Sequence, residues 1–400
     1  MSEGGFDEGY GSSEVTYQSW FSRLGNAIKG VLIGLFLFVV SFPLLFWNEG
    51  RAVRTYNSIA EAKGKVVPIS SDAVDPANEG KLVFLTGKAV TDDTLGDPAF
   101  GVEGKVLRLR RHTQIYQWKE TIETRTEKQL GGGTKEIKTA KYGKIWSDEP
   151  INSGSFRDRA GHENTGSIEF PSQTQTAPKI TVGAFALSNE LADRLNDFKT
   201  VPAFSSGFDK AADAVKKNWK VAGDSYYRGA DPQSPAIGDQ RVTFSQVAPA
   251  DVSLYSEQTG NTFRRFQTKS GDAMSRIETG LHSAAELFQH DESENNLVTW
   301  ILRVIGFVVM ALGSYLVFAP LVVLADVLPF LGNILSMGVG LFAGLIAAVL
   351  SLITIAIAWV FYRPLLAAGL LAAAALLIGA VFYLRRRPGM PNRLVPPPRV

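Results

Sequence analysis

The chain has 400 residues, of which 45% are hydrophobic, and a formal net charge of +2. A charge this close to zero provides no overall basic surface, so we expect no nucleic-acid partner. Cysteine is absent, which excludes disulfides, thiolate metal sites and cysteine nucleophiles. The apolar residues concentrate in residues 30–47 and 304–384, and this uneven distribution predicts membrane-spanning helices that flank a polar region.

The chain divides into a polar tail, four apolar helices and a long polar region. A bilayer core is about 30 Å thick, so roughly 20 apolar residues span it as a helix. The first apolar stretch has no small-residue cleavage site and is expected to remain as a signal anchor. The predicted segments are a disordered polar tail at 1–27, transmembrane helices at 28–47, 298–325, 334–362 and 364–384, a short cytoplasmic loop at 326–333, and a basic, Pro-rich cytoplasmic tail at 385–400.

The orientation in the membrane follows from charge. Three consecutive arginines at 385–387 adjoin the last helix, so the positive-inside rule predicts a cytoplasmic C-terminus, and four spans place the N-terminus on the same side. In this topology Trp47, Trp300 and Trp359 all fall at the outer interface, where tryptophan is enriched. Residues 48–297 are therefore expected outside the cytoplasm, in a periplasm or in the lumen of the endoplasmic reticulum.

The polar region contains many β-rich segments and few helices. Residues 115–125 and 135–146 flank three consecutive glycines, which predicts a long hairpin. Strands and helices without regular alternation predict an α+β domain, β-rich, inserted between the first and second helices of a four-helix transmembrane protein. Further strands are expected at 81–86, 105–111, 179–187, 240–247 and 252–255, and helices at 188–198, 208–219 and 281–296.

Small residues mark candidate helix-packing faces. Gly30 and Gly34 lie four residues apart, as do Gly340, Gly344 and Ala348. Such faces let helix backbones approach closely, within a bundle or between copies. The alternative is that glycine and alanine are simply common in membrane helices.

Two charges interrupt the apolar stretches. Arg303 lies one turn inside the second helix and is expected to extend toward Asp291, Glu292 and Glu294 at the interface. Asp326 is either an intramembrane acid with a function or an ordinary loop residue between two helices.

A mixed basic and aromatic cluster is a candidate surface for partners or lipid headgroups. It comprises Arg108, Arg110 and Arg111 in the strand predicted at 105–111, and Tyr116 and Trp118 at the start of the predicted hairpin. The alternative is a solvated or salt-bridged sheet face.

The sequence contains no recognised catalytic or cofactor-binding motif. His282, Glu286 and His290 share a helix face at spacings that could ligate a metal, but an amphipathic surface beside an acidic run is the favoured explanation. We therefore assign no catalytic, cofactor-binding or metal residues, expect no cofactor, and expect no enzymatic activity.

Several short motifs together resemble the LUMA family, also called transmembrane protein forty-three. These motifs run from the end of the first helix to the start of the fourth and include NEGRA at 48–52, NEGKLV at 78–83, LRRH at 109–112, YQW at 116–118, TKSGD at 268–272 and FYRP at 361–364. The tails at 1–14 and 385–400 depart from the animal proteins. The absence of cysteine and the Ala-rich fourth helix favour a bacterial relative.

The resemblance implies a membrane protein without known catalysis that self-associates and organises membrane protein complexes. In animals it implies the endoplasmic reticulum and inner nuclear membrane, and for a bacterial relative we expect the inner membrane with a periplasmic domain. The leading hypothesis is a non-catalytic scaffold, a homo-oligomer with membrane lipids and other membrane proteins as partners. The alternative is a ligand- or lipid-sensing module, or an accessory to transport.

Overall fold

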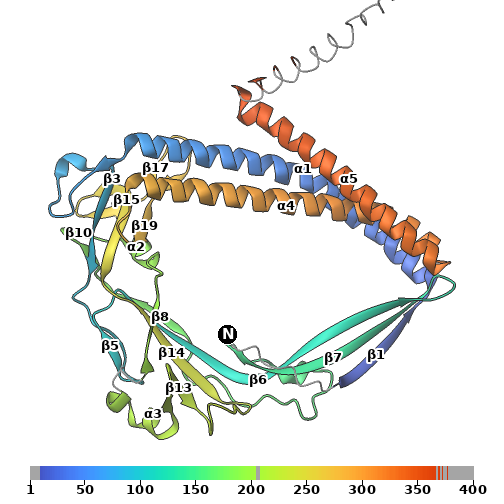
Figure 1. Ribbon diagram of the computed structural model, residues 1–400, viewed down its shortest axis with the longest axis horizontal. Coiled ribbons are helices and arrows are strands. Elements are labelled where there is room, and N and C mark those ends of the chain that lie inside the picture. Colours follow the sequence, from blue (N-terminus) through green and yellow to red (C-terminus); the bar gives the residue numbers. More distant parts are fainter. Residues whose placement is uncertain (1–9, 204–207, 366–367, 370–371, 373–375, 377–400) are drawn as a thin grey trace, which may run out of the picture.

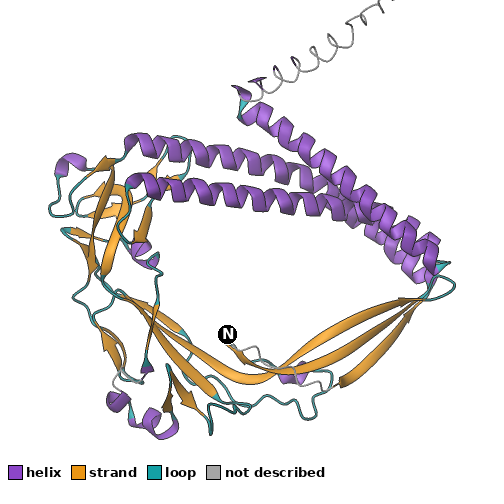
Figure 2. Cartoon of the chain, viewed as in Figure 1, coloured by secondary structure: helices purple, strands orange, loops and turns teal. Residues whose placement is uncertain are grey.

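A computed structural model describes residues 10–203 and 208–365, together with positions 368, 369, 372 and 376. Three long helices form one side of an open frame, and β-sheets form the rest of it (Figures 1 and 2). The α-helices in the described part of the chain are α1 (Trp20–Lys65), α2 (Asn189–Asp193), α3 (Asp213–Asn218), α4 (Ala284–Ala325) and α5 (Pro329–Tyr362).

The strands are mostly short, with one long hairpin among them. They are β1 (Tyr10–Gln18), β2 (Val67–Pro68), β3 (Leu82–Val90), β4 (Leu95–Asp97), β5 (Val102–Gly104), β6 (Arg108–Lys128), β7 (Thr134–Ser147), β8 (Gln173–Thr176), β9 (Thr181–Val182), β10 (Phe185–Ala186), β11 (Lys199–Val201), β12 (Lys220–Ala222), β13 (Ser225–Arg228), β14 (Gln240–Val247), β15 (Ala250–Thr259), β16 (Thr262–Arg264), β17 (Phe266–Gln267), β18 (Ala273–Met274) and β19 (Arg276–Thr279).

The first long helix extends beyond its apolar stretch in both directions. Ser19 caps α1 by accepting a hydrogen bond from the Ser22 backbone N–H. The 46-residue helix is about 69 Å long at about 1.5 Å per residue, so it continues well into the region expected to begin the domain. The prediction of a disordered tail at 1–27 is wrong for residues 10–27, because β1 pairs with β7 and α1 begins at Trp20.

The other two long helices form a hairpin around Asp326. A capping box starts α4, in which Ser283 and Glu286 each bond the other's backbone N–H. Asp326 is its C-cap, and Pro329 occupies the first turn of α5. The connection is therefore shorter than the predicted loop at 326–333. The fourth helix, expected at 364–384, lies mostly outside the described residues.

Two large sheets build most of the β-rich region, with β4-β5 and β17-β18 as separate two-stranded pairs. The eight-stranded sheet has the order β1-β7-β6-β14-β13-β12, with β8 on β6 and β11 on β14, and the seven-stranded sheet has the order β10-β9-β3-β15-β16, with β2 on β3 and β19 on β15. The hairpin of β6 and β7 confirms the sequence prediction, and it pairs from Ile115 with Ser147 to Lys128 with Thr134. The predicted helices at 188–198 and 208–219 are present only as the shorter α2 and α3.

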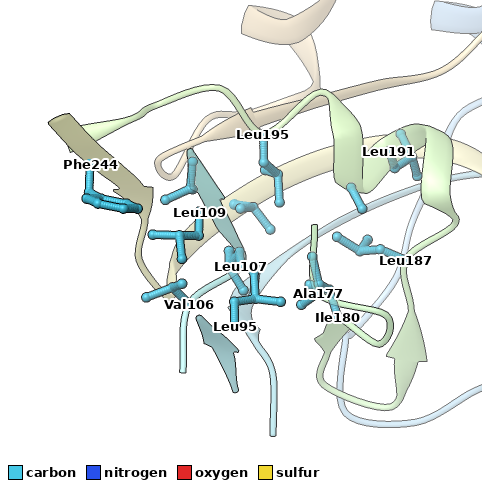
Figure 3. Packing of buried hydrophobic residues seen from close by; sticks show 14 of the residues in the cluster. Leu95, Val106, Leu107, Leu109, Ala177, Ile180, Leu187, Leu191, Leu195 and Phe244 are labelled. Carbon is cyan, nitrogen blue, oxygen red and sulfur yellow. The ribbon is translucent and has the colours of Figure 1, made fainter. Parts of the chain in front are cut away.

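The largest core fills the space between the two sheets. Buried side chains from both sheets and from α2 converge there, including those shown in Figure 3. A second core joins the end of α1 to the domain, where Ile59 and Ala62 pack with Tyr255, Leu287 and Phe288. The start of α4 and the end of α1 are therefore part of the folded domain and not merely connections to it.

The tip of the long hairpin touches the far end of the helix bundle (Figure 1). The backbone N–H of Gly131 donates to the carbonyl of Val327 at 3.1 Å, and Lys128 Nζ lies 2.6 Å from Asp326 Oδ1. The predicted topology places 48–297 and 326–333 on opposite sides of the membrane. That separation is wrong for the hairpin tip, because these contacts join residues 128–131 to residues 326–327. The 14 paired residues per strand, at about 3.3 Å each, give the hairpin the length to reach that end of the helices.

Candidate functional sites in the helix bundle

The close contact between α1 and α4 depends on two glycines. A Cβ placed on Gly34 would lie 2.8 Å from the carbonyl oxygen of Gly313, and one on Gly313 would lie 2.6 Å from the backbone nitrogen of Phe38. Backbone atoms cannot yield as a flexible side chain can, so both positions require glycine. Gly34 thus lies at a close contact between helices, and its partner is Gly313 of α4, which the sequence pattern did not indicate.

The other predicted packing residues make few close contacts with neighbouring helices. A Cβ on Gly30 would only just reach Leu316, at 4.0 Å, and Cβ atoms on Gly340 and Gly344 would meet nothing within 4 Å. Ala348 is half-buried. The face of α5 that packs within the chain is instead made by Val339, Ala343, Ala347 and Ala358, all buried.

A buried ion pair joins all three long helices near the domain. Glu49 of α1 accepts hydrogen bonds from Arg303 Nε at 2.6 Å and Nη2 at 2.9 Å, and from the Trp359 indole of α5 at 2.8 Å. The Glu49 side chain is 1% exposed and that of Arg303 is 18% exposed. The prediction that Arg303 extends toward the acidic residues at the start of α4 is wrong, because Glu49 offers a two-point partner one helix away.

A second polar layer lies one turn closer to the domain. Arg51 donates to Asn295 Oδ1 at 3.0 Å and to Thr299 Oγ1 at 2.8 Å. Asn48 donates to the Thr299 carbonyl, and Asn295 donates to the Ala52 carbonyl. These reciprocal bonds between α1 and α4 fix the register of the two helices where they leave the apolar region.

Asp326 forms the third charged cluster, at the opposite end of the bundle. Its carboxylate is fully buried and is paired with Arg23 of α1 and with Lys128 of the hairpin. The packing is tight, since a Cβ on Gly332 would lie 1.7 Å from Asp326 Oδ1. The Trp20 indole adds a bond of 2.8 Å to the Val323 carbonyl. We call the contacts of Asp326 with Arg23 and Lys128 the hairpin latch.

The predicted basic and aromatic surface is divided among separate internal contacts. Arg108 is buried and donates to the carbonyls of Asp193 and Leu195. Arg110 stacks on Phe198 at 3.8 Å, and Arg111 pairs with Asp97. These arginines hold the α2 segment and the β4 strand against the sheet.

The aromatic members of that predicted surface lie further along β6. Tyr116 packs against Trp146, and Trp118 packs edge-on against His162 and carries Lys144 above its ring at 4.7 Å. The structure therefore does not gather the five residues into one surface.

The histidines at the start of α4 belong to an ionic network. His290 Nδ1 lies 2.8 Å from Glu278, while Arg276 pairs with Asp291 and Glu294. Burial by itself raises the pKa of Glu278, but hydrogen bonds from Arg276 and His290 outweigh it and hold the pKa below its ordinary value. Within residues 10–203 and 208–365 no group of three metal-ligating side chains converges.

Glu49 is the important residue that sequence reasoning missed. Its NEGRA motif contributes only to the family resemblance, no role for Glu49 is predicted from the sequence, and the residue lies inside α1. Charged residues in membrane-spanning helices usually pair with one another. The signal that could have identified Glu49 is therefore an acidic residue at the end of one apolar stretch together with Arg303, one turn inside another.

The geometry defines a multi-pass membrane protein. Three described helices, α1, α4 and a 33-residue segment of α5, are long and apolar enough to cross a bilayer, and a β-rich region lies between the first two. Apolar side chains such as those of Leu32, Phe36 and Leu352 are largely exposed on them, as expected of surfaces that face lipid.

The chain belongs to the family described as Transmembrane protein 43, whose model matches residues 115–364. It is 36% identical over 372 residues to mouse Transmembrane protein 43, covering 90% of this chain and 91% of that protein. It is 37% identical to the human protein over 357 residues, covering 86% and 88%. A fruit-fly homolog is 27% identical over 361 residues, covering 86% and 92%.

The family resemblance inferred from the short motifs is thus confirmed. The expectation of a bacterial relative is not supported, since these relatives are animal proteins. No solved structure matches the chain.

Proposed function

We propose that the protein is a non-catalytic membrane scaffold that self-associates through α5 and organises other membrane proteins around the resulting assembly. The observation that carries the proposal is the open small-residue face of α5. A Cβ placed on Gly340 or on Gly344 would meet no other atom within 4 Å, and the adjacent Leu341 and Leu345 are 67% and 65% exposed.

The two faces of α5 support this assignment. One face already packs within the chain through Val339, Ala343 and Ala347. The other repeats small residues at spacings of four, the same arrangement that permits close backbone approach between membrane helices. A second copy of α5 offers an identical face, so a symmetric contact needs no further partner.

The charged clusters support a structural role for the bundle. Glu49, Arg303 and Asp326 each have ionic partners, and these contacts tie the three helices and the hairpin into one frame. A buried carboxylate that is fully paired holds a fixed geometry, whereas a group that performs chemistry needs access to a substrate.

The test is the mass of the full chain in mild detergent, measured by light scattering. We expect a discrete oligomer that Gly344→Leu converts to monomer. Gly338→Leu is the matched control, because Gly338 lies on the same helix, is equally open, and faces another direction. A monomeric wild-type protein, or equal effects of the two substitutions, would overturn self-association through this face.

A further inference from the structure

A cavity of about 430 Å³ lies where the apolar part of α1 ends. It is lined by Trp47, Arg51, Arg54 and Asn57 from α1, by Ser270 from the domain, and by Tyr362 from the end of α5. One wall is therefore aromatic and the other carries hydrogen-bond donors. From this arrangement we infer that the cavity binds the phosphate of an anionic phospholipid headgroup.

The polar wall contains more positive than negative charge. Arg51 is held in place by Asn295 and Thr299, and its Nε is buried with no hydrogen-bond partner among the described residues. Arg54 is half-exposed, and its closest carboxylate oxygen, on Asp272, is 3.7 Å away, which is too long for a hydrogen bond. Asp272 forms an ion pair with Arg54, and the Glu49 carboxylate near Arg51 is already paired with Arg303, so the two guanidinium groups leave one positive charge free for an added anion.

Guanidinium groups favour phosphate in particular. Their planar donors match pairs of phosphate oxygens, and such charge-assisted bonds are stronger than neutral ones. The Asn57 amide and the Ser270 hydroxyl line the same cavity and can donate to the remaining oxygens.

The aromatic wall indicates that the phosphate belongs to a lipid. Trp47 and Phe361, both lining residues, are 52% and 69% exposed and stand at the ends of apolar helices, the level at which aromatic residues meet headgroups. The Tyr362 ring packs directly on Gly50 of α1, since it lies 2.6 Å from where a Cβ on that glycine would be. Exposed apolar side chains on α1 and α5 continue from this wall and provide a path for acyl chains.

The test measures binding of dioleoyl phosphatidylglycerol to the full chain in mild detergent, with bound lipid counted by native mass spectrometry. We expect Arg54→Gln to lower the affinity about tenfold, which is the effect of losing one charge-assisted hydrogen bond. Lys63→Gln is the matched control, since Lys63 is a half-exposed cation on the same helix but outside the cavity. We expect it to bind the lipid like the wild type.

The second arm distinguishes the source of the phosphate. Failure of millimolar inorganic phosphate to displace the lipid supports a headgroup site, whereas displacement at that concentration would overturn the lipid assignment in favour of a free anion. The proposed site is refuted if Arg54→Gln and Arg51→Gln both bind the lipid with wild-type affinity. It is also refuted if Arg54→Gln and Lys63→Gln lower the affinity for the lipid equally. The oligomeric mass of Arg54→Gln should equal that of the wild type, so this test does not depend on self-association.

Discussion

Removing either partner of the Glu49–Arg303 pair should destabilise the helix bundle, and the two losses should differ. Arg303→Gln leaves a carboxylate that is 1% exposed without its cation, so water cannot replace the lost partner. Breaking a buried pair in this way costs about 3–5 kcal/mol. Glu49→Gln leaves a guanidinium that is 18% exposed and lies 4.9 Å from the Trp300 ring. We expect it to cost about 1–3 kcal/mol.

The assay is thermal unfolding of the full chain in mild detergent, followed by tryptophan fluorescence. The double variant Glu49→Gln with Arg303→Gln contains no unpaired charge, so it should be more stable than Arg303→Gln alone. Trp359→Phe keeps an aromatic side chain but removes the indole N–H and part of the ring system, so it should cost at least about 1 kcal/mol for the lost hydrogen bond. The reasoning is refuted if Glu49→Gln is the more damaging single change, or if the losses in the double variant simply add.

Three further predictions concern the rest of the frame. Gly313→Leu should push α1 and α4 apart and lower the unfolding temperature by more than Gly338→Leu, whose site is open; equal effects would contradict the packing role. Asp326→Asn should release the hairpin latch and speed tryptic cleavage after Lys128, as followed by mass spectrometry, whereas unchanged cleavage would show that the latch is dispensable. Because the pKa of Glu278 is lowered on folding, its contribution to stability is present above its ordinary value of 4.5 and is lost as pH falls through the folded-state pKa. Glu278→Gln should therefore flatten the acid limb of a stability–pH curve, and an unchanged limb would exclude this residue as its source.

Local patterns predicted the parts of the fold that depend on local physics. The glycine-flanked hairpin, the strands at 81–86 and 240–247, and the first three apolar helices follow from turn chemistry and hydrophobicity, and all of these are present among the described residues. The β1 strand was missed because its residues are polar and gain order only by pairing with β7, more than 100 positions away in the chain.

The candidate sites were predicted less well because each depends on contacts between distant segments. The sequence singles out Arg303 and Asp326 as charges that interrupt apolar stretches, but their partners come from other helices and from the hairpin. The arginines of the basic and aromatic cluster on β6 make internal contacts, as in the alternative of a salt-bridged sheet face, and neighbours in sequence bond to different parts of the domain. A charge pattern shows that a partner is needed and does not show which one.

The hairpin latch has a mechanical consequence. The long helices and the hairpin are similar in length, about 69 Å for α1 and about 70 Å for the 21 residues of β6. They are joined at one end by the β-rich region and at the other by the hairpin latch. A bilayer thicker or thinner than the apolar stretch changes the tilt of the helices that cross it. We expect a tilt of the helices relative to the β-rich region to bend the hairpin or to open the latch at Asp326, which would couple membrane thickness to the shape of that region.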